Sequence, residues 1–139
     1  GVRLSPYGSF NDMSDSDPNT LFNYVLKELS SRKVAFAHLV EPRSSSAGSS
    51  DKNLSGQPDT ADLFRKSFMG VLISAGGYTA QMAVEAVESG RADAVAFGRY
   101  YISNPDLVER IKAGAEFNEY DRNTFYGGAE KGYTDYPTL

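Results

Sequence analysis

Short apolar runs alternate with helix-like patterns along most of this chain. Four such units follow one another, each an apolar run typical of a strand followed by apolar residues at helical spacing. The predicted strands are residues 2–4, 34–40, 71–74 and 94–97, and the predicted helices are residues 20–31, 60–67, 79–89 and 104–113. Because strands that alternate with helices pair in parallel, we expect an α/β fold whose sheet is covered on both faces or closed into a barrel.

Polar residues mark the loops between these elements. The acidic loop before the first helix places Asp15 and Asp17 at a spacing that resembles the start of a calcium-binding loop. Such a loop needs glycine at its sixth position and glutamate at its twelfth, where this chain has threonine and leucine, so a helix cap is the better interpretation. Residues 44–58 are rich in Ser and Gly and predict a loop. Pro105 and Gly114 fit the usual asymmetry of helix ends.

The last part of the chain has a different character. Residues 116–139 are rich in Tyr, Gly and Asn and show no clear period. Their aromatic residues include Tyr120, Phe125, Tyr126, Tyr133 and Tyr136. Because disordered segments are poor in aromatic residues, we expect residues 116–139 to form a C-terminal tail packed on the barrel.

Composition narrows the classes of function. The 139 residues suffice for one domain with a core, and the net charge of −4 lacks the surplus of Lys and Arg that nucleic-acid binding requires. With no cysteine and one histidine, the chain offers neither a thiolate nor a site with two histidines, and no metal site is predicted. Its apolar runs are far shorter than the roughly 20 residues that cross a bilayer, so no membrane partner is expected.

The chain starts at Gly1 with no Met, signal peptide or leader, directly on a predicted strand. This start indicates a fragment or a processed product. The lack of a targeting segment then says little about where the parent protein resides, for which the cytoplasm is the default expectation.

Two glycine-containing turns follow the third and fourth predicted strands. In the first, Gly76 and Gly77 allow positive φ angles and a close approach of the backbone to a ligand, while Thr79 can cap the next helix. The N–H groups of that helix's first turn favour an anion. In the second, Gly98 allows a close approach and Arg99 supplies a bidentate charge for a phosphate. An ordinary strand-to-helix turn explains the first segment equally well when it is taken alone.

The position of these two turns strengthens the phosphate interpretation. In (β/α)8 barrels the phosphate site is frequently built by the loops after strands seven and eight. If the last two units of this chain are units seven and eight, the chain holds units five to eight. The predicted fold is therefore the last four βα units of a (β/α)8 barrel, a half barrel with an aromatic-rich tail.

Four charged or titratable residues on or after the first two strands also attract attention. Arg3 stands in an apolar strand, where a charge must be paired or functional, although exposure near the chain start is the alternative. His38 is a lone histidine in a strand, and such a histidine is more often a hydrogen-bonded structural residue than a base. Glu41 and Arg43 flank a proline and are predicted to pair with each other or with nearby loops.

Taken together, these motifs resemble the carboxyl-terminal half of the Old Yellow Enzyme family of flavin-dependent ene-reductases, including its 12-oxophytodienoate reductase-like members. The matching strings are residues 1–6 (GVRLSP), 38–43 (HLVEPR), 74–79 (SAGGYT), 96–99 (AFGR), 103–107 (SNPDL), 120–122 with 124–126 (YDR and TFY) and 132–137 (GYTDYP). Their order and spacing make the resemblance specific.

The resemblance implies an FMN-binding barrel in which these units are the last four. It implies that Arg3 contacts the pyrimidine side of the flavin around N1 and O2. It implies that Tyr126 lies near the flavin and the substrate opening, so that Arg3 and Tyr126 are the predicted catalytic residues. Together with Arg3, the cofactor-binding residues that it implies are Gly76, Gly77, Gly98 and Arg99, the last four at the FMN phosphate.

The resemblance also implies an activity. NADPH gives a hydride to flavin N5, and the β-carbon of an α,β-unsaturated carbonyl compound then takes it while a protein acid protonates the α-carbon. The family's carbonyl-binding pair and its tyrosine proton donor come from the first half of the barrel, so this chain is expected to need that N-terminal half as its partner. Two other interpretations remain open: a non-catalytic half barrel that binds FMN or a phosphate ligand by self-association, and a phosphate-binding barrel of another chemistry, such as a sugar-phosphate isomerase.

Overall fold

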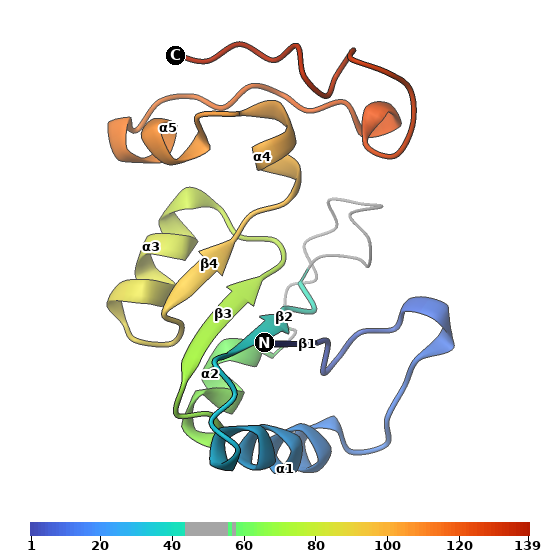
Figure 1. Cartoon of the computed structure of the whole chain (residues 1–139), viewed down its shortest axis with the longest axis vertical. Helices are drawn as coiled ribbons and strands as arrows, with labels where there is room; N and C mark the ends of the chain where they lie inside the picture. The colour runs from blue at the N-terminus through green and yellow to red at the C-terminus, as the bar shows by residue number, and fades with distance from the viewer. Residues whose placement is uncertain (44–55, 57) are drawn as a thin grey trace. The chain divides into compact units, whose positions relative to one another are not determined.

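The computed structural model describes residues 1–43, 56 and 58–139 (Figure 1). The predicted loop of residues 44–58 lies almost wholly outside these described residues. Two compact units divide the chain, Gly1–Ala96 and Phe97–Leu139. Each unit is described by itself.

A parallel sheet of four strands forms the centre of the first unit. The strands are β1 (Val2–Leu4), β2 (Phe36–Val40), β3 (Val71–Ala75) and β4 (Ala94–Ala96), paired in chain order. In the register, Arg3 is opposite His38, and His38 is opposite Ile73. The four predicted strands are therefore confirmed, but β2 begins at Phe36 rather than at Val34 because the Val34 amide donates to Leu29 O at the end of the preceding helix.

Within the described residues, three α-helices belong to the same unit. They are α1 (Pro18–Ser31), α2 (Thr60–Phe64), which continues into the 3-10 turn η3 (Arg65–Ser67), and α3 (Ala80–Glu88). Each begins at a side-chain cap: Asp17 accepts from the Thr20 amide, Asp59 from the Asp62 amide and Thr79 from the Met82 amide. The caps predicted at the acidic loop and at Thr79 are confirmed.

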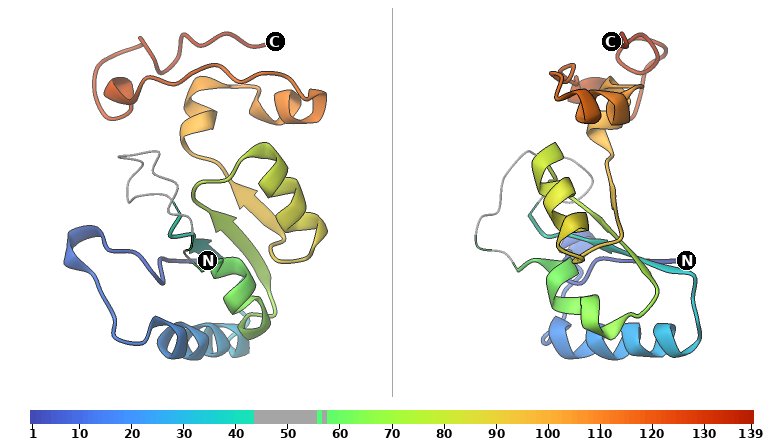
Figure 2. Two further views of the ribbon diagram at one scale, coloured as in Figure 1. Left: turned by 180° about the vertical axis from the view of Figure 1, so that it is seen from behind. Right: turned by 90° about the vertical axis from the view of Figure 1, so that its left-hand side faces the viewer.

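The core of the first unit lies on one face of its sheet. Alternate strand residues, among them Ala37, Leu39 and Leu72, are fully buried with side chains of α1 and α2. Figure 2 shows α2 and α3 on the same side of the sheet. On the opposite face, Phe36 is 38% exposed and Val71 is 48% exposed. Within the described residues one face is thus covered and the other is open, which is the arrangement expected for part of a closed barrel.

The second unit contains short helices and an extended tail. Its elements are α4 (Arg99–Ser103), α5 (Leu107–Ala113) and the 3-10 turn η4 (Arg122–Thr124). The prediction of one helix over residues 104–113 is wrong at its start, because Asn104 has extended backbone angles and separates α4 from α5. Gly114 ends α5 in the left-handed region at φ 62°, as its position predicted.

The tail folds back on α5 inside this unit. The buried Arg110 donates from Nε to Asp106 (2.8 Å), from Nη1 to Glu116 O (2.7 Å) and from Nη2 to Pro137 O (3.0 Å). The Leu139 amide donates to the second Asp106 oxygen at 2.6 Å. One arginine and one aspartate therefore fix both ends of residues 116–139, whose packing on a barrel stays a prediction.

Candidate cofactor site

The Gly76–Gly77 turn connects β3 to α3. Gly76 has φ 111° and Gly77 has φ 67°, values that side chains with a Cβ rarely adopt. A Cβ built on Gly77 would also lie 3.0 Å from Arg43 Cγ. Thr79 caps the nine-residue helix α3 by accepting from the Met82 amide at 3.2 Å. The sequence prediction of a glycine turn with positive φ angles before a capped helix is confirmed.

The Gly98–Arg99 turn follows β4 and starts α4. Gly98 has φ −101°, and a Cβ built there would meet no heavy atom of the described residues within 4 Å. Its φ angle and its packing against these residues therefore do not require glycine. The Arg99 guanidinium lies 5.6 Å from the Tyr100 ring centroid and 5.7 Å from the Tyr120 ring centroid. Two aromatic faces thus hold this cation in the second unit.

The sheet brings the starts of these turns to the same edge. Ala75 at the end of β3 is paired with Ala96 at the end of β4. Gly76 follows the first of these residues, and the segment that contains Arg99 follows the second. A phosphate shared by both turns remains a prediction, since each turn is described within its own unit.

Arg3 and His38 lie on neighbouring strands at paired positions. Arg3 is exposed, and His38 is half-buried with Nε2 lacking a hydrogen-bond partner in the described part of the chain. Burial, and then the positive charge of Arg3, lower the pKa of His38 below its usual value of 6.5. His38 is therefore neutral at pH 7. The sequence predicts a hydrogen-bonded structural histidine here, but the described residues provide no partner for Nε2.

Glu41 is the buried acceptor of this region. Its side chain is fully buried and accepts from the Thr60 amide (2.7 Å), the Ala61 amide (3.0 Å) and the Ser74 hydroxyl (2.8 Å). Arg43 Nη2 lies 3.3 Å from its Oε2, so the pairing predicted for these two residues is confirmed. The partners at residues 60, 61 and 74 are distant in sequence and no local pattern indicated them.

Tyr78 connects the glycine turn to the same group. Its ring lies under the Arg43 guanidinium, 4.5 Å from centroid to Cζ, and its hydroxyl donates to Ser74 Oγ at 2.9 Å. Burial raises the pKa of Tyr78 above its usual value. The phenol therefore stays protonated and acts as a donor at neutral pH.

Tyr126 lies at the surface of the second unit. Its side chain is 83% exposed, and its ring meets the Phe125 ring edge-on at 6.1 Å between centroids. The exposure is compatible with the predicted place at a substrate opening, which stays a prediction.

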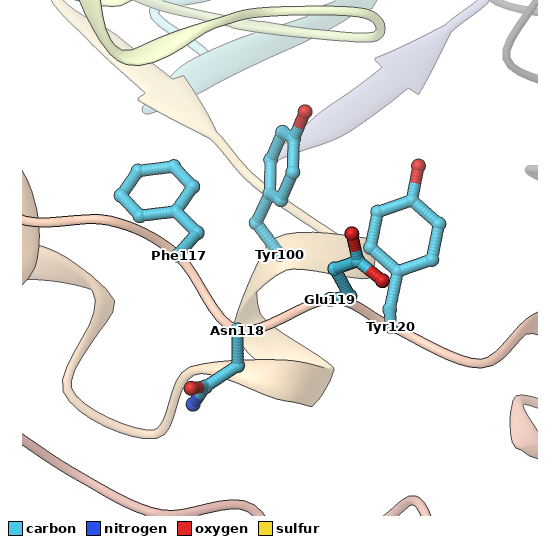
Figure 3. Close-up of a pocket in the computed structure, with 5 residues that line it drawn as sticks. All are labelled: Tyr100, Phe117, Asn118, Glu119 and Tyr120. Atoms are coloured by element: carbon cyan, nitrogen blue, oxygen red, sulfur yellow. The ribbon is translucent and has the colours of Figure 1, made fainter.

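A shallow pocket of about 310 Å³ lies in the second unit, between the Arg99 helix and the tail. It is lined by Tyr100, Phe117, Asn118, Glu119 and Tyr120. Figure 3 shows the three rings and the Glu119 carboxylate on one side of the backbone and the Asn118 side chain pointing away. No sequence pattern indicated this pocket, because its rings come from two segments without a shared period.

Among the residues that the structure describes, no group of three or more His, Cys, Asp or Glu side chains is placed to hold a metal ion. In the same part of the chain, no helix is long and apolar enough to cross a membrane.

Comparison with known proteins identifies the class. Residues 1–118 match the model of the NADH:flavin oxidoreductase / NADH oxidase family. The chain is 39% identical to 12-oxophytodienoate reductase 2 of Arabidopsis thaliana, over 100% of this chain and 36% of the relative. It is 38% identical to a flavin oxidoreductase of Emericella nidulans, over 99% of this chain and 39% of the relative.

Two solved structures also match nearly the whole of this chain. Morphinone reductase in complex with tetrahydroNAD matches with a TM-score of 0.84 and 41% identity, over 99% of this chain and 35% of that one. The old yellow enzyme from Trypanosoma cruzi matches with a TM-score of 0.85 and 34% identity, over 99% of this chain and 34% of that one.

The chain belongs to the NADH:flavin oxidoreductase / NADH oxidase family. Its resemblance to the Old Yellow Enzyme family is confirmed, as is the parallel α/β class of a partial (β/α)8 barrel. The chain spans just over a third of the length of these relatives, 36% for the first of them.

Proposed function

We propose that this chain supplies the FMN phosphate site, and part of the flavin ring site, of an ene-reductase. The enzyme would use NADPH to reduce the activated C=C of α,β-unsaturated carbonyl compounds. When bound, FMN supplies a hydride acceptor and donor at its N5 atom. The observation that supports this proposal most strongly is the Gly76–Gly77 turn with its two positive φ angles at the start of α3, in a chain of this family.

The chain's polar groups fit a phosphate. The amides of Gly76 and Gly77 and the first turn of α3 offer backbone donors to an anion. Arg99 offers a guanidinium, which matches the geometry of phosphate oxygens. Gly98 has open space where a Cβ would stand, so a ligand can approach its backbone. In this proposal Gly76, Gly77, Gly98 and Arg99 hold the phosphate from two successive turns.

Arg3 would act at the flavin ring. A permanent cation beside N1 and O2 stabilises the negative charge that develops there on reduction. Its neighbour across the sheet, His38, is neutral at pH 7, so the positive charge at this pair of positions comes from Arg3. Tyr126, with its exposed ring, would border the flavin and the substrate opening.

The N-terminal half of the barrel would be the partner of this chain, supplying the groups that hold the substrate carbonyl and protonate the α-carbon. The open sheet face that contains Phe36 and Val71 supports this need for a partner. The same open face also favours a second candidate, a self-associating half barrel that binds FMN without catalysis.

Activity distinguishes these two candidates. In a chimaera, this chain would replace the matching segment of 12-oxophytodienoate reductase 2. NADPH oxidation by the chimaera would be followed with and without 2-cyclohexenone. We expect enone-dependent oxidation by the chimaera and none by the chain alone. The native relative is the positive control. A chimaera that retains FMN but fails to reduce the enone would contradict the ene-reductase proposal.

A further inference from the structure

Arg43 packs directly against the glycine turn. A Cβ on Gly77 would lie 3.0 Å from Arg43 Cγ, 3.6 Å from Cδ and 3.6 Å from the Arg43 carbonyl carbon. The aliphatic part of this arginine therefore lies in close contact with the place that a Cβ at position 77 would take. On the far side of the turn, the Arg43 guanidinium covers the ring of Tyr78 at 4.5 Å. One side chain thus contacts two successive residues of the turn.

Arg43 is itself held in place by two carboxylates. Its Nη2 lies 3.3 Å from Glu41 Oε2 and 3.6 Å from Asp59 Oδ2, and its side chain is only 17% exposed. Asp59 also pairs with Arg91 at 2.7 Å. Because its charge is matched by these acids, Arg43 is better placed to support the turn than to bind an anion itself.

The carboxylate that anchors Arg43 is fixed by three further elements. Glu41 follows β2, accepts from two amides at the start of α2 and accepts from Ser74 on β3. Ser74 in turn accepts from the Tyr78 hydroxyl at 2.9 Å. The network formed by Glu41, Arg43, Ser74 and Tyr78 therefore begins and ends at the glycine turn.

We propose that Arg43 is a positioning residue for phosphate binding. Its packing on Gly77 and Tyr78, fixed by Glu41 and Asp59, holds the Gly76–Gly77 backbone in the conformation that receives the anion. This inference rests on the proposed function for the identity of the anion, FMN. Its physical basis is entropic: two consecutive glycines have the widest backbone freedom in a chain, and a turn ordered before binding does not lose that freedom on binding.

The first test needs no flavin. Backbone ¹⁵N relaxation of the purified chain would report order parameters for the Gly76 and Gly77 amides, compared between the native chain and Arg43→Met. The methionine keeps an unbranched chain beside Gly77 and removes the guanidinium. We expect order parameters near 0.85 in the native chain and below about 0.6 in the variant at these two amides, with the β3 amides unchanged.

The chain offers a matched control at the other end of β3. Arg65 is also partly buried, with a side chain 25% exposed; it pairs with Asp93 and donates to Phe68 O and Gly70 O. Arg65→Met removes a comparable set of contacts and should leave the Gly76 and Gly77 amides ordered. Arg43→Lys, which keeps the charge and an aliphatic stem, should restore part of the order. Equal order at both glycines in the native chain and in Arg43→Met would overturn the inference.

The second test uses two flavins. Riboflavin lacks the phosphate of FMN, so the ratio of their dissociation constants isolates phosphate binding. For Arg43→Met we expect about a tenfold loss of FMN affinity, the factor for ordering one residue's backbone, and no change for riboflavin. Equal losses for both flavins would mean that Arg43 only stabilises the fold. If the native chain binds both flavins equally, the proposed phosphate site fails, while the relaxation result still decides whether Arg43 orders the turn.

Discussion

The turns after β3 and β4 both contain glycine, but their conformations have different origins. At Gly77 the backbone has φ 67° and a Cβ would crowd Arg43 Cγ at 3.0 Å, so the turn favours glycine within its own unit. At Gly98 the backbone has φ −101°, and no described residue lies within 4 Å of the place of a Cβ. The comparison suggests that the first turn is shaped by a buried network and that the second leaves room for a ligand.

Two groups of charged residues, one from each unit, also differ in burial. In the first unit the fully buried Glu41 unites two helix amides, a serine and Arg43. In the second unit Glu109 and Lys112 form an ion pair whose side chains are 66% and 67% exposed. Burial makes the first group costly to disturb, and solvent screening makes the second nearly neutral for stability.

The largest expected effect is that of Glu41→Ala. Removing this carboxylate leaves the buried Thr60 and Ala61 amides without their acceptor and Arg43 without its nearest acid. We expect a loss of about 3 kcal/mol in unfolding free energy, measured by urea denaturation. Glu109→Ala is the control and should change stability by less than about 0.5 kcal/mol. Similar losses for both variants would remove the contrast between the units.

Arg99→Ala should have the next largest effect, on binding rather than folding. A hydrogen bond from a charged group contributes about 1.5 to 3 kcal/mol, so its loss should weaken FMN binding by roughly 10- to 100-fold. The affinity for riboflavin, which lacks the phosphate, should not change. Fluorescence quenching of each flavin measures this. Arg32→Ala, at the exposed end of α1, is the matched control. Unchanged FMN affinity in Arg99→Ala would refute the role of Arg99 at the phosphate.

Gly77→Ala and Gly98→Ala test the two turns directly. At Gly77 the positive φ and the 3.0 Å approach to Arg43 predict a destabilisation of about 2 kcal/mol. At Gly98 neither factor operates, so stability should change by less than about 0.5 kcal/mol while FMN affinity falls. The difference in denaturation midpoints gives the comparison, and equal midpoints would show that the turns do not differ.

The smallest expected effect concerns the pKa of His38, which lies opposite the exposed Arg3 in the sheet. Burial lowers the pKa of His38 most, and Arg3 adds a smaller decrease. In Arg3→Ala the pKa should rise but remain below 6.5, as followed by NMR titration of the chain's one histidine. No rise would mean that Arg3 does not act on this face.

The same shift sets the direction of a pH effect on stability. The folded pKa of His38 lies below its unfolded value, so the unfolded state binds the proton first as the pH falls through 6.5. Stability associated with His38 is therefore present above pH 6.5 and is lost as the pH falls toward the folded pKa. His38→Gln should make the stability profile flatter between pH 7.5 and 5.5, and an identical profile would contradict this account.

Local patterns predicted local structure well. Thr79 and Gly114 act through contacts a few residues away, so their roles at helix ends followed from their neighbours in sequence. Helix α4 was missed because Asn104 interrupts the pattern through a bond that joins its Oδ1 to the Asn118 amide, 14 residues on. Likewise, Glu41 finds Thr60 and Ser74 at separations of 19 and 33 residues. Such partners depend on strand register and helix placement, which periodicity does not specify.

In the candidate site too, local features could be predicted from the sequence and long-range contacts could not. The turn at Gly76 and Gly77 was predictable because paired glycines before a capping threonine carry a local signal. The packing of Arg43 on that turn was not, since it depends on β2 and β3 being neighbours in the sheet. The roles predicted for Arg3 and Tyr126 come from the resemblance, and that of Arg99 comes from its position after the fourth strand; all three stay predictions.

The most direct test of the central proposal is flavin retention. The purified chain would be mixed with FMN, or separately with riboflavin, freed of excess by gel filtration and examined by visible absorption. The phosphate site predicts a retained FMN band, shifted from that of the free cofactor, and a riboflavin sample from which the flavin is lost. Equal retention of both flavins would contradict a phosphate site built by the Gly76–Gly77 and Gly98–Arg99 turns of this chain, and loss of both would show that these turns do not hold FMN without the N-terminal half.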